Sequence, residues 1–244
     1  INFITADSSM SEHRALYTGD AAFNSCSADQ ANHSLGIHRG FLHGMEGGGA
    51  LPMFSNPGAF FLGTLVPSEQ MFIKTVLESA RVNGYNKVVE PCAGAFAMSH
   101  LAVQTGFVPQ QIEASDVSMF TSIMGYAITG QSLEALELHA DGFTDEELLN
   151  PAIALYAWKY LSMIKDAEKE YFYAHLIDME RRRDEHIAVL QQQLDRAKSI
   201  LHGMSYRALD MWEHLEEVID DPHALVIANP PTYTAGFEKY YDTC

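Results

Sequence analysis

The chain has 244 residues and a formal net charge of −17, with 15 Lys and Arg against 32 Asp and Glu. Its 47% hydrophobic and 19% charged residues fit a folded chain with one sizeable core and exclude wholesale disorder. The charge excludes a protein that grips nucleic acid with its whole surface, so such contacts must be local. Three cysteines without paired spacing argue against a disulfide framework or cysteine zinc site and favour a reducing compartment.

Residues 1–60 are rich in Gly, Ser, Asn and Ala and show no sustained helical or strand period. We therefore expect an irregular N-terminal segment. His33, His38 and His43 recur there at five-residue spacing, which places them on different faces of a helix. Because no carboxylate or cysteine completes the set, we predict no metal site.

An α/β alternation begins at Pro67-Ser68-Glu69, which predicts the start of a helix that Asn83-Gly84 ends. Short strands at 87–90 and 111–115 enclose a turn and a helix over 98–104, and the second strand leads to Asp116. This order is typical of the opening of a doubly wound α/β sheet.

A helix over residues 119–129 and a third strand around 136–139, ending near Asp141, continue this alternation. Residues 145–219 then read as almost continuous helix, with apolar side chains at three- and four-residue steps. These steps favour packing between helices, or a contact surface for self-association or a protein partner. Arg181-Arg182-Arg183 is flanked by acidic residues, which favours a salt-bridged surface over a DNA contact.

The segment 224–228 has the strongest strand pattern of the chain, and Asn229-Pro230-Pro231 follows it. Because two prolines lack N–H groups, this turn presents its carbonyls outward. The Asn229 amide oxygen and the Pro230 carbonyl could accept both hydrogens of an NH2 group, and Tyr233 could stack on a flipped base. A Pro-Pro turn that merely closes a core strand is the alternative interpretation.

Glu90-Pro91-Cys92-Ala93-Gly94 lies between a strand and a helix, where backbone N–H groups can approach a ligand and Gly94 leaves room for it. Asp116 follows the next strand, where an acid can accept hydrogen bonds from both ribose hydroxyls of a nucleoside cofactor. A plain strand-to-helix turn and an N-cap are the alternatives for these two features.

In this order the motifs resemble the S-adenosylmethionine-dependent adenine-N6 DNA methyltransferases, in particular the divergent enzymes that phages carry as protection against restriction. The resemblance implies a Rossmann-like class I methyltransferase sheet with a long helical insertion, incomplete at its C-terminal end. It implies S-adenosyl-L-methionine as cofactor and adenine in DNA as substrate. It assigns Asn229, Pro230, Pro231 and Tyr233 to catalysis, and Pro67, Ser68, Glu90, Pro91, Cys92, Ala93, Gly94, Asp116 and Asp141 to the cofactor.

The chain departs from the family pattern at Thr232, where an aromatic residue is expected and Tyr233 comes one position later. We predict four segments: an irregular one over 1–60, the first half of the core over 61–144, a helical insertion over 145–221, and the fourth strand with the catalytic turn over 222–244.

Two other functions stay open. The acidity also fits a catalytically degenerate fold that acts as an interaction or antirestriction protein, and an Asn-Pro-Pro turn also suits an amino group of RNA or of protein glutamine. Pro and Gly interrupt the uncharged stretches, so we expect no membrane span and a cytoplasmic protein, in the host cytoplasm if phage-encoded.

Overall fold

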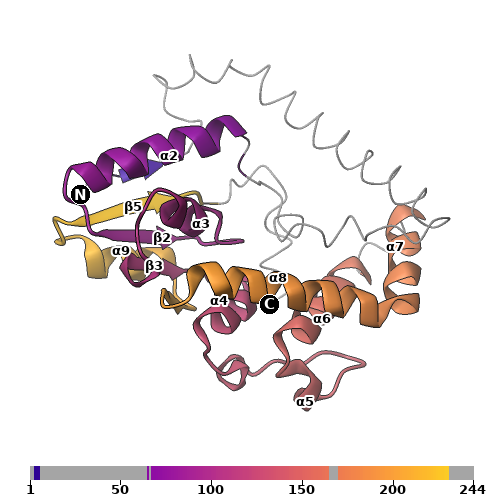
Figure 1. Ribbon diagram of the computed structural model, residues 1–244. Coiled ribbons are helices and arrows are strands. Elements are labelled where there is room, and N and C mark those ends of the chain that lie inside the picture. Colours follow the sequence, from indigo (N-terminus) through magenta and orange to yellow (C-terminus); the bar gives the residue numbers. More distant parts are fainter. Residues whose placement is uncertain (1–2, 6–64, 66, 165–169, 231–244) are drawn as a thin grey trace.

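In a computed structural model of the chain, residues 3–5, 65, 67–164 and 170–230 are described. Five parallel strands form one sheet in the order β1-β5-β2-β3-β4 (Figure 1). The strands are β1 (Phe3–Thr5), β2 (Lys87–Pro91), β3 (Ile112–Ser115), β4 (Ser205–Arg207) and β5 (Ala224–Ala228). The Rossmann-like α/β fold predicted from the sequence is confirmed.

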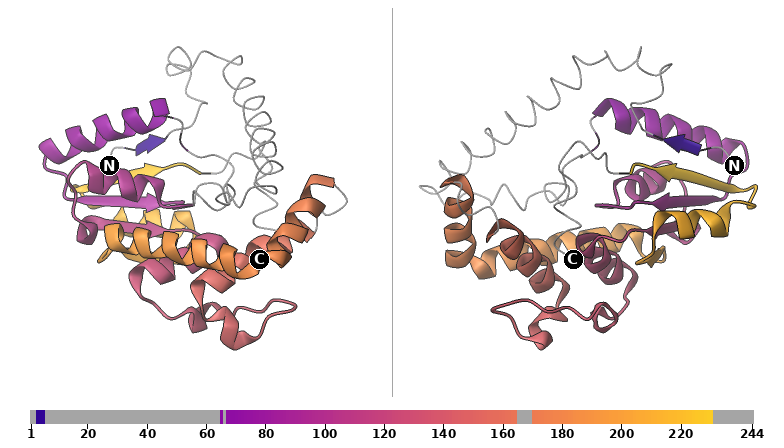
Figure 2. Two further views of the ribbon diagram at one scale, coloured as in Figure 1. Left: turned by 45° about the vertical axis from the view of Figure 1, so that its right-hand side comes forward. Right: turned by 180° about the vertical axis from the view of Figure 1, so that it is seen from behind.

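Helices cover both faces of this sheet, as an all-parallel sheet requires. The covering helices are α2 (Pro67–Val82), α3 (Ala97–Gln104), α4 (Met119–Thr129) and α9 (Met211–Val218). Neighbouring strand residues point to opposite faces, so Val88 joins the main core with α2, α3 and α4, whereas Val89 packs with Val218 of α9. Figures 1 and 2 show α3 and α9 on opposite sides of the strands.

A long helical segment lies between β3 and β4 and extends beyond the sheet (Figure 1). After α4 it comprises the 3₁₀ helix η4 (Leu133–Leu136), α5 (Asp145–Leu148), α6 (Pro151–Ile164), α7 (Glu170–Arg181) and α8 (Arg183–Leu201). The apolar side of α8 is buried in the main core, where α8 packs against α4 and α6. The apolar steps noted in the sequence therefore serve packing within the chain. Within the described ranges, no helix is long and apolar enough to cross a membrane.

The strand expected around residues 136–139 is wrong. Ser132 caps η4 there by accepting a hydrogen bond from the Glu134 N–H, and Glu137 adopts a left-handed conformation with φ 47°, which interrupts extended backbone. The next core strand is instead β4, in a stretch where the sequence suggested helix. Gly203, with φ 96°, follows α8, and the buried Tyr206 then alternates with exposed neighbours. The helical segment thus falls between the second and third strands of the core rather than between the third and fourth.

A strand also occurs in the N-terminal segment expected to be irregular. Phe3–Thr5 pairs in parallel with Val226–Ala228, on the side of β5 that faces away from β2. The edge of β5 that faces away from β2 is therefore paired with residues from the start of the chain. The rest of residues 1–60, including the three spaced histidines, lies outside the described residues.

Candidate functional site

The carboxyl ends of β5, β2, β3 and β4 lie at the same level of the sheet. Val226 of β5 pairs with Val89 of β2, and Pro91 of β2 pairs with Ser115 of β3, which in turn pairs with Arg207 of β4. Counting on from these pairs places Asn229, Cys92 and Asp116 side by side, one step beyond the strands. This edge is where open α/β sheets bind ligands.

The turn that follows β2 is held in an unusual backbone conformation. Cys92, Gly94 and Phe96 have φ values of 123°, 51° and 60°, and such values are uncommon for residues other than glycine. The N–H groups of Cys92 and Ala93 both donate to the Ser115 carbonyl, at 2.9 and 3.0 Å. Strain of this kind persists only where the surroundings enforce it, and it concentrates at functional sites.

Asp116 joins this turn to β3. Its Oδ2 accepts the Gly94 N–H at 3.0 Å and its Oδ1 accepts the Ser118 N–H at 2.8 Å. The side chain is nearly buried at 6% exposure, and burial raises the pKa of Asp116. The Val117 backbone and the Thr121 side chain also act on this carboxylate and, with Gly94 and Ser118, oppose the effect of burial on its pKa. The structure thus brings together the glycine and the acid that the sequence singled out.

Glu90 lies under the same turn and caps the helix that follows it. Its carboxylate accepts the N–H groups of Met98 and Ser99, at 3.3 and 3.0 Å, and the Ser99 hydroxyl. Burial raises the pKa of Glu90 to about 8. Glu90 therefore organises the start of α3 from inside the core, as an acid at a helix N-terminus does.

An aromatic pair supports the turn from below. Phe96 stands where a second glycine would be usual, and its buried ring meets that of Tyr206 edge to face at a centroid distance of 5.6 Å. The Tyr206 hydroxyl donates to the Asp116 carbonyl at 3.0 Å. Gly125 of α4 makes room for this ring, because a Cβ there would lie 2.3 Å from Tyr206. Tyr206 was missed in the sequence because its strand has only three residues.

Asn229 and Pro230 follow β5 directly and are both half-buried. They lie at the carboxyl edge of the sheet, and the role suggested for them by the sequence stays a prediction. Pro231 and Tyr233 lie outside the described residues.

Three further residues border the same edge and were not singled out in the sequence. Val117 is apolar yet 50% exposed directly after Asp116. Asp210 caps α9 by accepting the Trp212 N–H at 2.8 Å, and the Met211 sulfur lies 3.6 Å from the Cys92 sulfur. Two signals could have revealed Val117 and Asp210. Val117 is an exposed valine directly after an acid at a strand end, and Asp210 lies four residues before His214 of α9.

The other residues assigned to the cofactor lie farther from this arrangement. Pro67 and Ser68 begin α2 and are exposed; since α2 leads through a short turn into β2, its first turn lies toward the carboxyl edge. Asp141 was included because a strand was expected to end near it. The structure places Asp141 in an exposed turn before α5, separate from the strand ends.

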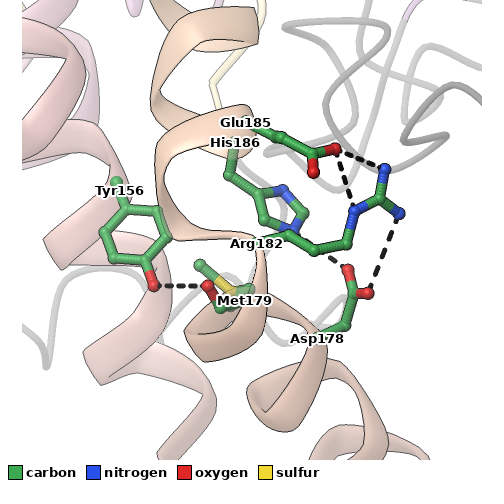
Figure 3. Close-up of polar contacts among 6 residues, drawn as sticks. All are labelled: Tyr156, Asp178, Met179, Arg182, Glu185 and His186. Carbon is green, nitrogen blue, oxygen red and sulfur yellow. Dashed lines mark hydrogen bonds and ion pairs between the residues drawn. The ribbon is translucent and has the colours of Figure 1, made fainter.

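Two arginines of the run at the junction of α7 and α8 are paired with acids, and Figure 3 shows the contacts of Arg182. Arg182 lies 2.7 Å from Glu185 and 3.9 Å from Asp178, whose other oxygen is 3.0 Å from His186. Arg183 contacts Glu147 at 3.1 Å and lies over the Phe143 ring. For Arg182 and Arg183 the salt-bridged surface predicted from the sequence is therefore confirmed.

The fold is that of a Rossmann-like α/β protein and is compatible with a methyltransferase. A family model, Phage DNA Adenine Methylase-like domain 1, matches residues 61–244. The chain belongs to this phage DNA adenine methylase-like family, as its motifs suggested. Comparison with curated proteins and with solved structures gave no match.

Proposed function

We propose that this protein transfers a methyl group from S-adenosyl-L-methionine to the exocyclic amino group of adenine in DNA. One observation carries the proposal: the Gly94–Asp116 hydrogen bond of 3.0 Å and the Asn229-Pro230 turn lie at the same carboxyl edge. Each feature alone has a structural explanation, but together they supply a nucleoside site and an amino-group acceptor beside it. The family match over residues 61–244 supports a DNA methyltransferase.

The residues at this edge suit the proposed cofactor. Asp116 follows β3 at the carboxyl edge, where an acid can accept hydrogen bonds from ribose hydroxyls, and the turn around Gly94 offers backbone close to the methionine part. Val117 and the half-buried Met211 supply apolar contacts for an adenine ring, and Asp210 can accept from its amino group. Bound S-adenosyl-L-methionine supplies an electrophilic methyl group.

Asn229 and Pro230 would orient the target. Two carbonyl acceptors, the Asn229 side chain and the Pro230 backbone, hold both amino hydrogens and so direct the nitrogen lone pair toward the methyl group. No strongly basic side chain is required, because the amino nitrogen loses its proton only after methylation. A base must leave the DNA stack to reach this edge, and the negative protein charge of −17 restricts backbone contacts to a few local ones. A role in protecting phage DNA from restriction follows from this chemistry.

Cofactor binding is tested by calorimetry with S-adenosylhomocysteine. Asp116→Ala should weaken binding roughly tenfold or more, because it removes hydrogen bonds to charged oxygen worth about 1.5–3 kcal/mol. Asp220→Ala, at an exposed position, is the matched control and should bind like the wild type. A wild-type protein that does not bind S-adenosylhomocysteine would refute the proposal.

Methyl transfer is tested by the resistance of plasmid DNA to restriction enzymes that adenine methylation blocks. We expect Asn229→Ala to lose about 100-fold or more in methylation rate, in the range of a lost transition-state hydrogen bond, while S-adenosylhomocysteine affinity stays unchanged. Asn86→Ala, an exposed asparagine before β2, is the control. Cofactor binding without methylation of DNA would instead support a degenerate fold, and labelled RNA or protein would identify another acceptor.

A further inference from the structure

His214 of α9 is completely buried and points at β3. Its Nδ1 lies 2.7 Å from the Ser115 Oγ, whereas its Nε2 is 3.9 Å from the nearest carboxylate oxygen, on Glu113, and makes no hydrogen bond. A buried polar atom without a hydrogen bond is destabilising, and an apolar pair of the same shape would avoid that cost. The polar side chain at this place therefore calls for a reason other than packing.

Ser115 is the residue on which the proposed cofactor site depends. Its carbonyl accepts the N–H groups of Cys92 and Ala93, and the next residue is Asp116, which accepts the Gly94 N–H. Any displacement of Ser115 would thus move the turn and the acid together. Because its hydroxyl contacts His214, the position of this strand end is linked to α9.

The charges around the ring favour one tautomer. The Glu113 carboxylate, which also pairs with Lys87 at 3.2 Å, faces Nε2 and favours a proton there. Nδ1 is then free to accept the Ser115 hydroxyl proton. Burial lowers the pKa of His214, which agrees with a neutral ring.

His214 lies in the first turns of α9, where its backbone N–H donates to the Asp210 carbonyl at 3.1 Å as in any helix. We propose that His214 is a positioning residue: through Ser115 it holds the turn at 92–94 and Asp116 in the geometry that binds the cofactor. This inference rests on the proposed function.

Two amide substitutions at His214 distinguish a positioning role of the side chain from a packing role. The amide group of His214→Asn can take the place of Nδ1 and keep the hydrogen bond to Ser115, whereas that of His214→Gln reaches the place of Nε2 and loses it. We expect S-adenosylhomocysteine affinity within about threefold of wild type for His214→Asn and roughly tenfold weaker for His214→Gln, an amount typical of one lost hydrogen bond. His202→Gln, at an exposed position after α8, is the control.

Two further measurements accompany the affinities. Ser115→Ala keeps the histidine and removes its partner, so it should weaken binding about as much as His214→Gln. Hydrogen exchange at the amides of residues 92–94 should rise in His214→Gln and Ser115→Ala but not in His214→Asn.

Equal affinities for the Asn and Gln variants, or native affinity and exchange in Ser115→Ala, would overturn this inference while wild-type binding upholds the proposed function. If the wild type itself does not bind S-adenosylhomocysteine, the proposed function fails and the inference fails with it.

Discussion

Glu90 and Asp116, at the carboxyl edge of the sheet, accept hydrogen bonds from backbone N–H groups. Asp178, in the helical segment, instead contacts the charged or titratable side chains of Arg182 and His186. All three acids are buried. N–H groups at turns and helix starts hold the two acids of the sheet edge, whereas side chains at the junction of α7 and α8 hold Asp178.

This difference distinguishes the candidate ligand site at the sheet edge from the helical segment, which supports the fold. Asp116 lies directly at a strand end, whereas Glu90, with a pKa raised to about 8 by burial, serves the start of α3. Asp178 is held by the side chains of Arg182 and His186 and contributes to local packing. We therefore expect changes in the helical segment to alter stability, and changes at the sheet edge to alter ligand binding or pH dependence.

Within the helical segment, the largest expected effect on stability is that of Asp178→Ala. It removes a hydrogen-bond partner of a histidine that is only 1% exposed, and leaving a buried polar group unsatisfied costs up to about 3 kcal/mol. Urea unfolding measures this loss, and S-adenosylhomocysteine affinity should stay within about twofold. Asp184→Ala, on the exposed side of α8, should change the free energy of unfolding by less than about 0.5 kcal/mol. A large loss of cofactor affinity in Asp178→Ala would contradict the expectation that changes in the helical segment alter stability and not ligand binding.

Glu90→Gln should change the pH dependence of unfolding. The pKa of Glu90 is about 8 in the folded chain against 4.5 as its ordinary value. The folded state thus holds the proton more tightly, and this contribution to stability is present below pH 4.5 and lost as the pH rises through 8. Relative to Glu90→Gln, the wild type should lose on the order of 5 kcal/mol between these limits. If the free energy of unfolding changed with pH in the same way for both proteins, Glu90 would not titrate in this range.

Gly125→Ala tests the support beneath the site. Alanine usually stabilises a helix by about 0.5–1 kcal/mol relative to glycine. Here its Cβ would lie 2.3 Å from the Tyr206 ring, so we expect destabilisation of about 1–3 kcal/mol and weaker cofactor binding, since Tyr206 holds the Asp116 carbonyl. Thermal unfolding and calorimetry measure both. A gain in stability would mean that Tyr206 lies elsewhere.

The smallest effect is expected for Arg182→Ala. Its guanidinium is partly exposed and pairs with the exposed Glu185, and pairs of this kind contribute less than about 1 kcal/mol. Methylation rate and DNA affinity should stay within about twofold of wild type. A salt-dependent loss of DNA affinity would reveal a backbone contact and would make this junction part of the substrate surface.

The sequence predicted those parts of the fold whose signals are local. The buried strands ending at Pro91, Ser115 and Ala228 have apolar runs, and the polar residues after them follow from parallel pairing. In contrast, Ser205–Arg207 is too short and polar to be recognised, and only its pairing with β3 makes it a strand. The His214–Ser115 contact was equally hidden, because it joins residues 99 positions apart whose types alone suggest nothing.

The parallel pairing of Phe3–Thr5 with Val226–Ala228 has a consequence for folding during synthesis. The first of these strands leaves the ribosome long before its partner exists, so it must wait unpaired while the intervening chain is made. Closing so large a loop is entropically costly and slow. The strand that precedes Asn229 therefore gains its second neighbour only at a late stage.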